Sequence, residues 1–104
     1  MLLRDLQIDP DHLADLCRRY GVARLEVFGS FARGDAAARS DLDLLATFES
    51  DSPGGLEFVA FQQELQTLLR RPVDLFTRSS VEGSPNKYFR RFALDQTELV
   101  YESN

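Results

Sequence analysis

A glycine–serine pair followed, ten residues later, by two aspartates constrains this chain more than any other feature. Gly29 and Ser30 end an apolar run that suits a strand, and Asp41 and Asp43 flank Leu42 where a second apolar run begins. Gly29 permits a tight turn, and Ser30 is a favourable N-cap for a short helix whose free N–H groups would attract an anion. Carboxylates two residues apart lie on one face of a strand. The pattern therefore predicts carboxylates that hold Mg²⁺ against the phosphates of a nucleotide.

Gly29-Ser30, ten residues and then Asp41-Leu42-Asp43 together resemble the signature of the DNA polymerase β-like nucleotidyltransferase superfamily. The longer strings Gly-Ser-Phe-Ala-Arg-Gly and Ser-Asp-Leu-Asp-Leu-Leu are similar to those of the minimal nucleotidyltransferase (MNT) family, and the similarity covers nearly the whole chain. This resemblance implies a small mixed sheet whose acid-bearing strands are neighbours. It also implies ATP as donor and transfer of AMP to a protein, and many family members are antitoxins paired with HEPN-domain toxins.

A third acid and two arginines complete the predicted site. Asp74 stands in the short apolar run Val73–Phe76, where aspartate is disfavoured, and it matches the third carboxylate of the family resembled. Such an acid can bind a metal or take the proton of an attacking hydroxyl, and the alternative is an edge-strand aspartate that faces water. Arg33 and Arg39 lie between the turn and the acidic pair. We expect them to hold phosphate oxygens, the alternative for each being a solvated surface arginine.

Composition narrows the class of protein. The 104 residues have room for one domain, 1–104, and the net charge of −5 provides no broad basic surface for direct binding of nucleic acid. Cys17 is the one cysteine, which excludes an internal disulfide and favours core filling. The sequence has no signal peptide and no apolar run near the roughly 20 residues of a membrane span. We therefore expect a cytoplasmic protein without membrane contact, and the sequence leaves a homo-oligomer open.

Periodicity predicts an alternation of helices and strands. We expect a first helix from Pro10 with Asp9 as its cap, and strands over 22–28, 41–48, 73–76 and 97–101. Further helices are expected over 56–71 and 86–95, the second capped by Ser84, with loops over 49–55 and 79–85. This order predicts an α/β or α+β fold, a mixed β-sheet with helices packed on it.

Two apolar stripes in the later helices are expected to pack on that sheet. The stripe of the helix over 56–71 includes Leu56 and Val59, and that of the helix over 86–95 includes Tyr88 and Phe92. The second stripe is interspersed with basic residues, but its aromatic residues follow the spacing of a helix core. The sequence therefore favours packing over contact with nucleic acid for this helix.

The sequence is best interpreted as a Mg²⁺-dependent transferase of AMP. Gly29 and Ser30 would cradle the phosphates of ATP, Asp41 and Asp43 would bind the metal, and Asp74 would act as ligand or base. A chain this short has no second domain to enclose an acceptor, so we expect a partner to deliver it. The resemblance suggests a HEPN toxin with a modifiable tyrosine.

Two other functions compete with this interpretation. The chain could be a catalytically idle antitoxin that neutralises its toxin by binding alone. It could also be a transferase that acts on RNA ends or a small molecule, which the acidic surface and the missing second domain disfavour.

Overall fold

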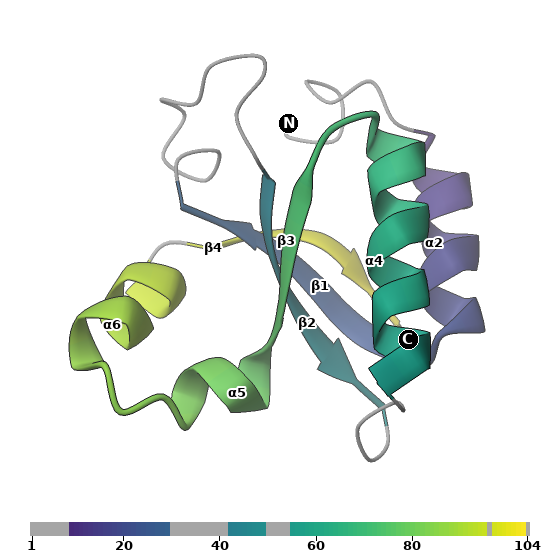
Figure 1. Cartoon of the computed structure of the whole chain (residues 1–104). Coiled ribbons are helices and arrows are strands. Elements are labelled where there is room, and N and C mark those ends of the chain that lie inside the picture. The colour runs from purple at the N-terminus through teal and green to yellow at the C-terminus, as the bar shows by residue number, and fades with distance from the viewer. Residues whose placement is uncertain (1–8, 30–41, 50–54, 96, 104) are drawn as a thin grey trace.

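Four strands form one mixed sheet in the computed structural model, which describes residues 9–29, 42–49, 55–95 and 97–103. The elements within these ranges are α2 (Pro10–Arg19), β1 (Val22–Phe28), β2 (Leu42–Phe48), α4 (Gly55–Leu69), β3 (Val73–Thr77), α5 (Arg78–Glu82), α6 (Lys87–Asp95) and β4 (Thr97–Glu102). The strand order is β3-β2-β1-β4, in which β1 is antiparallel to β2 and β4 while β2 is parallel to β3 (Figure 1). The predicted mixed sheet with helices packed on it is confirmed.

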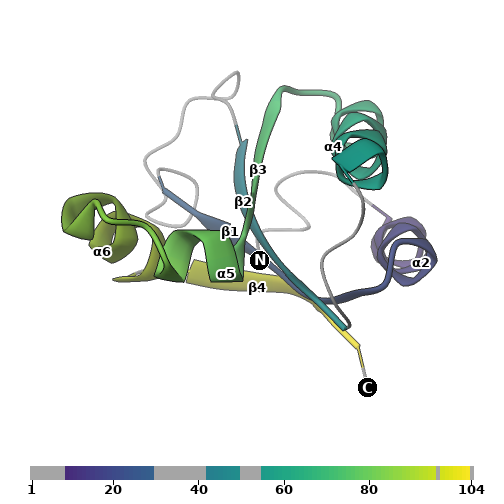
Figure 2. The same ribbon diagram turned by 60° about the horizontal axis from the view of Figure 1, so that its bottom comes forward.

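The main hydrophobic core lies between the sheet and the helices α2 and α4, which run side by side on one face (Figures 1 and 2). Alternation along the strands directs one set of side chains to this face. Its buried members are Leu13, Leu16, Cys17, Val22, Leu25, Val27, Leu42, Leu44, Ala46, Phe61, Leu65, Leu69, Val73 and Leu75. Cys17 is fully buried among them, as its expected core role requires.

A smaller cluster fixes α5 and α6 to the opposite face of the sheet. Its buried members are Phe28, Leu45, Val81 and Ala93, with Phe76, Phe89 and Leu94 packed against them. Aromatic contacts connect the sheet to α6, because Phe76 lies 5.7 Å from Phe28 and 5.5 Å from Phe89 between ring centroids. The two clusters give the sheet a covered layer on each side (Figure 2).

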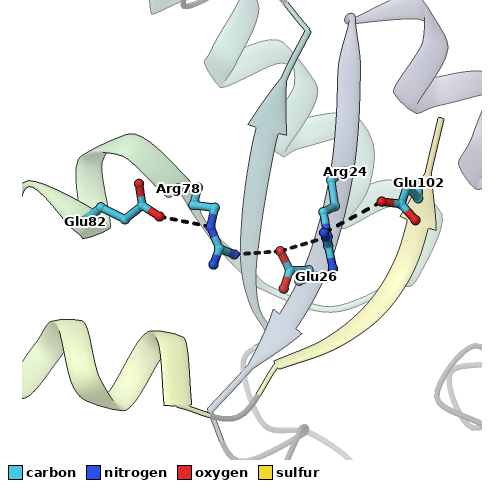
Figure 3. Close-up of polar contacts among 5 residues, drawn as sticks. All are labelled: Arg24, Glu26, Arg78, Glu82 and Glu102. Atoms are coloured by element: carbon cyan, nitrogen blue, oxygen red, sulfur yellow. Dashed lines mark hydrogen bonds and ion pairs between the residues drawn. The ribbon is translucent and has the colours of Figure 1, made fainter. Parts of the chain in front are cut away.

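An ion-pair ladder on this second face connects α5 to the far edge of the sheet (Figure 3). The carboxylate of Glu26 is only 3% exposed and lies 2.9 Å from the Arg78 guanidinium and 3.4 Å from that of Arg24. Arg78 also pairs with Glu82, and Arg24 with Glu102. A buried carboxylate is stable only when paired, so these ion pairs allow Glu26 to occupy the inner strand β1 and connect the start of α5 to that strand.

Two local predictions in the C-terminal half were wrong. Residues 79–82, expected in the loop over 79–85, belong to α5, whose N-cap is the Thr77 hydroxyl accepting from the Ser80 N–H. The cap of α6 is Asn86 rather than Ser84, since the Asn86 Oδ1 accepts from the N–H groups of Tyr88 and Phe89. In both cases a side-chain oxygen of the residue just before the helix satisfies free N–H groups of its first turn.

The two predicted apolar stripes are only partly buried. In α4 the fully buried residues are Phe61, Leu65 and Leu69, whereas Leu56 is 89% exposed and Val59 48%. These three buried residues are spaced at i, i+4 and i+8 and form the row that packs on the sheet, so the apolar residues beside this row face outward. In α6, likewise, the aromatic residues at 88 and 92 remain exposed. No helix in the described ranges combines the length and the apolar character needed to cross a bilayer.

Candidate functional site

Asp43 and Asp74 lie opposite each other on adjacent strands. Asp43 of β2 and Asp74 of β3 are register partners in the parallel pair, so both extend to the face that carries α5 and α6. Leu42 and Leu44, on either side of Asp43, are buried in the main core on the opposite face. Asp43 is half-buried and Asp74 is exposed on the edge strand. The prediction that the acid-bearing strands are neighbours is confirmed for this pair.

At Gly29, the turn after β1 lies against the Asp43 carboxylate. Its backbone has φ +74°, in the left-handed region that glycine adopts at little cost. A β-carbon at this position would lie 2.6 Å from Oδ2 of Asp43 and 3.6 Å from Cζ of Phe92. Because Gly29 has no side chain, it leaves space for the Asp43 carboxylate, which any other residue at position 29 would crowd. Two of the predicted features, the glycine turn and an acid of the Asp-x-Asp motif, are in direct proximity.

The rest of the predicted site falls outside the residues that the structure describes. These residues are Ser30, Arg33, Arg39 and Asp41, together with the short helix expected after the turn. Within the described ranges no three His, Cys, Asp or Glu side chains are grouped as a metal would need. Two carboxylates nevertheless fit Mg²⁺, because this ion is usually held by one or two carboxylates together with substrate phosphates and water.

Sequence reasoning assigned Phe92 to the core, but its ring lies at the edge of the candidate site. The ring is 45% exposed and meets the ring of Phe28 edge-on, at 6.2 Å between centroids. Phe28 is the register partner of Asp43 on the side away from Asp74. Helical spacing alone could not separate Phe92 from its buried neighbours, since Phe89 and Ala93 flank it on the same side of the helix.

A separate hollow of about 580 Å³ lies beside α5 and α6. Its lining residues are Glu82, Lys87, Arg90, Arg91, Leu94 and Asp95. Charges of both signs line it, and Gly29, Asp43 and Asp74 are not among its residues. Nothing about this hollow directs a particular ligand to it, so the paired carboxylates are the stronger candidate site.

Comparison with known proteins identifies the family of the chain. Residues 10–100 match the family model described as a nucleotidyltransferase domain. Over 90 residues the chain is 41% identical to protein adenylyltransferase MntA of Thermococcus cleftensis, an alignment that covers 86% of this chain and 84% of that protein. A solved structure assigned to the minimal nucleotidyltransferases is 34% identical, with a TM-score of 0.69 and coverage of 93% of this chain and 94% of that one.

More distant structures share the fold alone. One is a complex of a tri-AMPylated HEPN toxin with an MNT antitoxin from Shewanella oneidensis, matched with 16% identity and a TM-score of 0.62 over 94% of this chain and 73% of that one. Another is a toxin–antitoxin complex with AMP-PNP, with 17% identity and a TM-score of 0.68 over 93% of this chain and 76% of that one.

Proposed function

This chain belongs to the nucleotidyltransferase domain family, among its minimal members, and on that premise we propose that it transfers AMP from ATP to a hydroxyl of a partner protein. The observation that carries the proposal is the register pairing of Asp43 with Asp74 beside the bare α-carbon of Gly29. Paired carboxylates next to an open backbone turn suit a nucleotide triphosphate and its divalent cation.

Each predicted residue has a role in this proposal. Asp41 and Asp43 would hold Mg²⁺, with Asp74 as a further ligand or as base, and Gly29, Ser30, Arg33 and Arg39 would hold the phosphates. Bound there, the ion supplies positive charge that neutralises the triphosphate. In the transfer, the acceptor oxygen bonds to the α-phosphorus, the bond to pyrophosphate breaks, and the Asp74 carboxylate takes the hydroxyl proton. The exposure of Asp74 on an edge strand suits this step, because a protein acceptor can reach it.

The acceptor that best fits the relatives is a HEPN-domain toxin. The Thermococcus protein is named a protein adenylyltransferase, and one structural neighbour pairs an MNT antitoxin with a tri-AMPylated HEPN toxin. We take the modified group here to be a tyrosine hydroxyl of a HEPN toxin, reached in the cytoplasm where ATP is abundant. The added phosphate and adenosine would block an RNA-cutting site by charge repulsion and bulk, and this modification would outlast dissociation of the two proteins.

Intact-mass spectrometry of the toxin tests the proposal. The toxin is incubated with ATP, Mg²⁺ and either the wild type or the Asp43→Asn, Asp74→Asn double variant. The matched control is Asp15→Asn, an exposed carboxylate on the α2 face of the sheet. We expect mass additions of AMP with the wild type and the control, and none with the double variant. An unmodified toxin that all three proteins neutralise equally would reject the transferase and leave an antitoxin that works by binding.

A further inference from the structure

The Asp43 carboxylate has different neighbours on its two sides. Across β3 its partner is Asp74, and across β1 its partner is Phe28. Phe92 of α6 meets the ring of Phe28 edge-on, and Cζ of Phe92 is 3.6 Å from the β-carbon position of Gly29. The site is therefore bordered by an exposed acid on one side and by a half-exposed aromatic ring on the other.

These two sides correspond to the two reactants of a nucleotidyl transfer. Gly29 is the predicted phosphate turn, so the nucleotide occupies the β1 side of Asp43, and the acceptor approaches the exposed Asp74 on the β3 side. The base extends beyond the phosphates and the ribose. On the β1 side, the ring of Phe92 reaches the glycine turn, with its Cζ 3.6 Å from the β-carbon position of Gly29.

We propose that the ring of Phe92 is the surface on which the base of the bound nucleotide stacks, an inference that rests on the proposed function. A base has two apolar faces and gains free energy by covering one of them with an aromatic ring. Phe92 keeps 45% of its surface accessible while Phe28 supports its other side, and Phe76 supports Phe28 in turn. The rings behind Phe92 hold it in place, so little side-chain freedom is lost on binding.

The test compares Mg·ATP with Mg·tripolyphosphate, a ligand that has phosphates but no base. Both are titrated calorimetrically into the wild type and into Phe92→Leu. Leucine keeps an apolar side chain against Phe28 but lacks an aromatic face. The control is Tyr88→Ala, which removes a 74% exposed ring one turn earlier on α6. Urea unfolding of every variant confirms that the fold is retained.

We expect Phe92→Leu to weaken Mg·ATP binding about tenfold and to change tripolyphosphate binding less than twofold. Tyr88→Ala should bind both ligands as the wild type does. An equal loss for both ligands in Phe92→Leu would mean that Phe92 only supports the turn, and this would overturn the stacking proposal. Unchanged Mg·ATP binding in Phe92→Leu would overturn it as well.

The outcomes also separate this inference from the proposed function. A wild type that binds Mg·ATP more tightly than Mg·tripolyphosphate, in a manner that depends on Phe92, supports the stacking surface even if the toxin is never modified. A wild type that modifies the toxin but binds the two ligands equally well rejects the stacking surface and leaves the transferase in place.

Discussion

Oδ2 of Asp43 lies 2.6 Å from the point that a β-carbon on Gly29 would occupy. The two residues are fourteen positions apart in the sequence, and the antiparallel pairing of β1 with β2 brings them together. Gly29 therefore meets two independent requirements, a left-handed backbone with φ +74° and an open space beside a carboxylate. Gly21 has a similar φ of +71° but no atom within 4 Å of its β-carbon position, so it meets only the first.

The variants Gly29→Ala and Gly21→Ala separate these two requirements. Both should lower the free energy of unfolding by about 1–2 kcal/mol, because alanine is strained at positive φ. Only Gly29→Ala should also displace the Asp43 carboxylate and weaken Mg·ATP binding, by at least tenfold. Urea unfolding and calorimetric titration measure the two effects. If both variants bind Mg·ATP as the wild type does, the contact between Gly29 and Asp43 has no part in the site.

The proximity of Gly29, Asp43 and Asp74 could be predicted because much of its signal is local. The spacing of Gly29 and Asp43 and the unusual acid at Asp74 are properties of short segments, and strand alternation then places both acids opposite the leucines. The adjacency of the strands that carry Asp43 and Asp74 was predicted from the family resemblance, because neither segment by itself determines which strands pair. The parallel register of β2 with β3 confirms it.

What the sequence could not predict depends on tertiary packing. Helical periodicity predicts an apolar stripe but not which part of it the sheet covers, so the exposure of Leu56 and Phe92 was missed. The helix α5 was missed because its Ser-rich, Gly-flanked segment has the composition of a turn. Burial of Val81 against the sheet outweighs that preference, and the Thr77 cap assists it.

Neutralising Asp43 and Asp74 should remove a metal site without harming the fold. Neither side chain belongs to a hydrophobic core cluster, so the Asp43→Asn, Asp74→Asn variant should remain folded when EDTA is present. At about 100 times its dissociation constant, Mg·ATP should stabilise the wild type by about 2.7 kcal/mol and the double variant hardly at all. Thermal unfolding with and without ligand measures this difference. Asp15→Asn is the control, and equal stabilisation of all three proteins would contradict the metal site.

Breaking the ladder at Arg78 should cost more stability than breaking a shorter ion pair at the surface. Arg78→Met keeps the apolar stem but leaves the buried Glu26 with Arg24 alone, at 3.4 Å (Figure 3). We expect a loss of about 2 kcal/mol. Arg18→Met removes a pair with Asp15 at 2.7 Å, whose side chains are both about two-thirds exposed, and should cost less than about 0.5 kcal/mol.

The control for this interpretation is a second change at Glu26. Adding Glu26→Gln to Arg78→Met removes the buried charge and should recover part of the lost stability. Urea unfolding at pH 7 measures all four proteins, the wild type included. Equal losses for Arg78→Met and Arg18→Met would show that burial of Glu26 does not set the strength of the ladder.

The Cys17 thiol should make the folded protein less stable in alkali. Burial raises its pKa from 9.0 to about 12, and the neighbouring Arg18 charge only partly opposes this. Below pH 9 the thiol is protonated in both the folded and the unfolded chain, so it adds no pH dependence. Between pH 9 and 12 the unfolded chain loses the proton while the folded one keeps it. The stability that depends on the neutral thiol is therefore lost across that range as the pH rises.

The comparison with Cys17→Ala isolates this effect from other alkaline titrations such as those of tyrosine. The alanine variant is destabilised at every pH by the cavity it creates, but it has no thiol to ionise. Above pH 9 the free energy of unfolding of the wild type should therefore fall more steeply than that of the variant, by up to about 1.4 kcal/mol per pH unit. Urea unfolding at pH 8, 9 and 10 under reducing conditions measures the difference. A difference between the two proteins that stays constant over this range would mean that Cys17 ionises as readily in the folded protein as in the unfolded one.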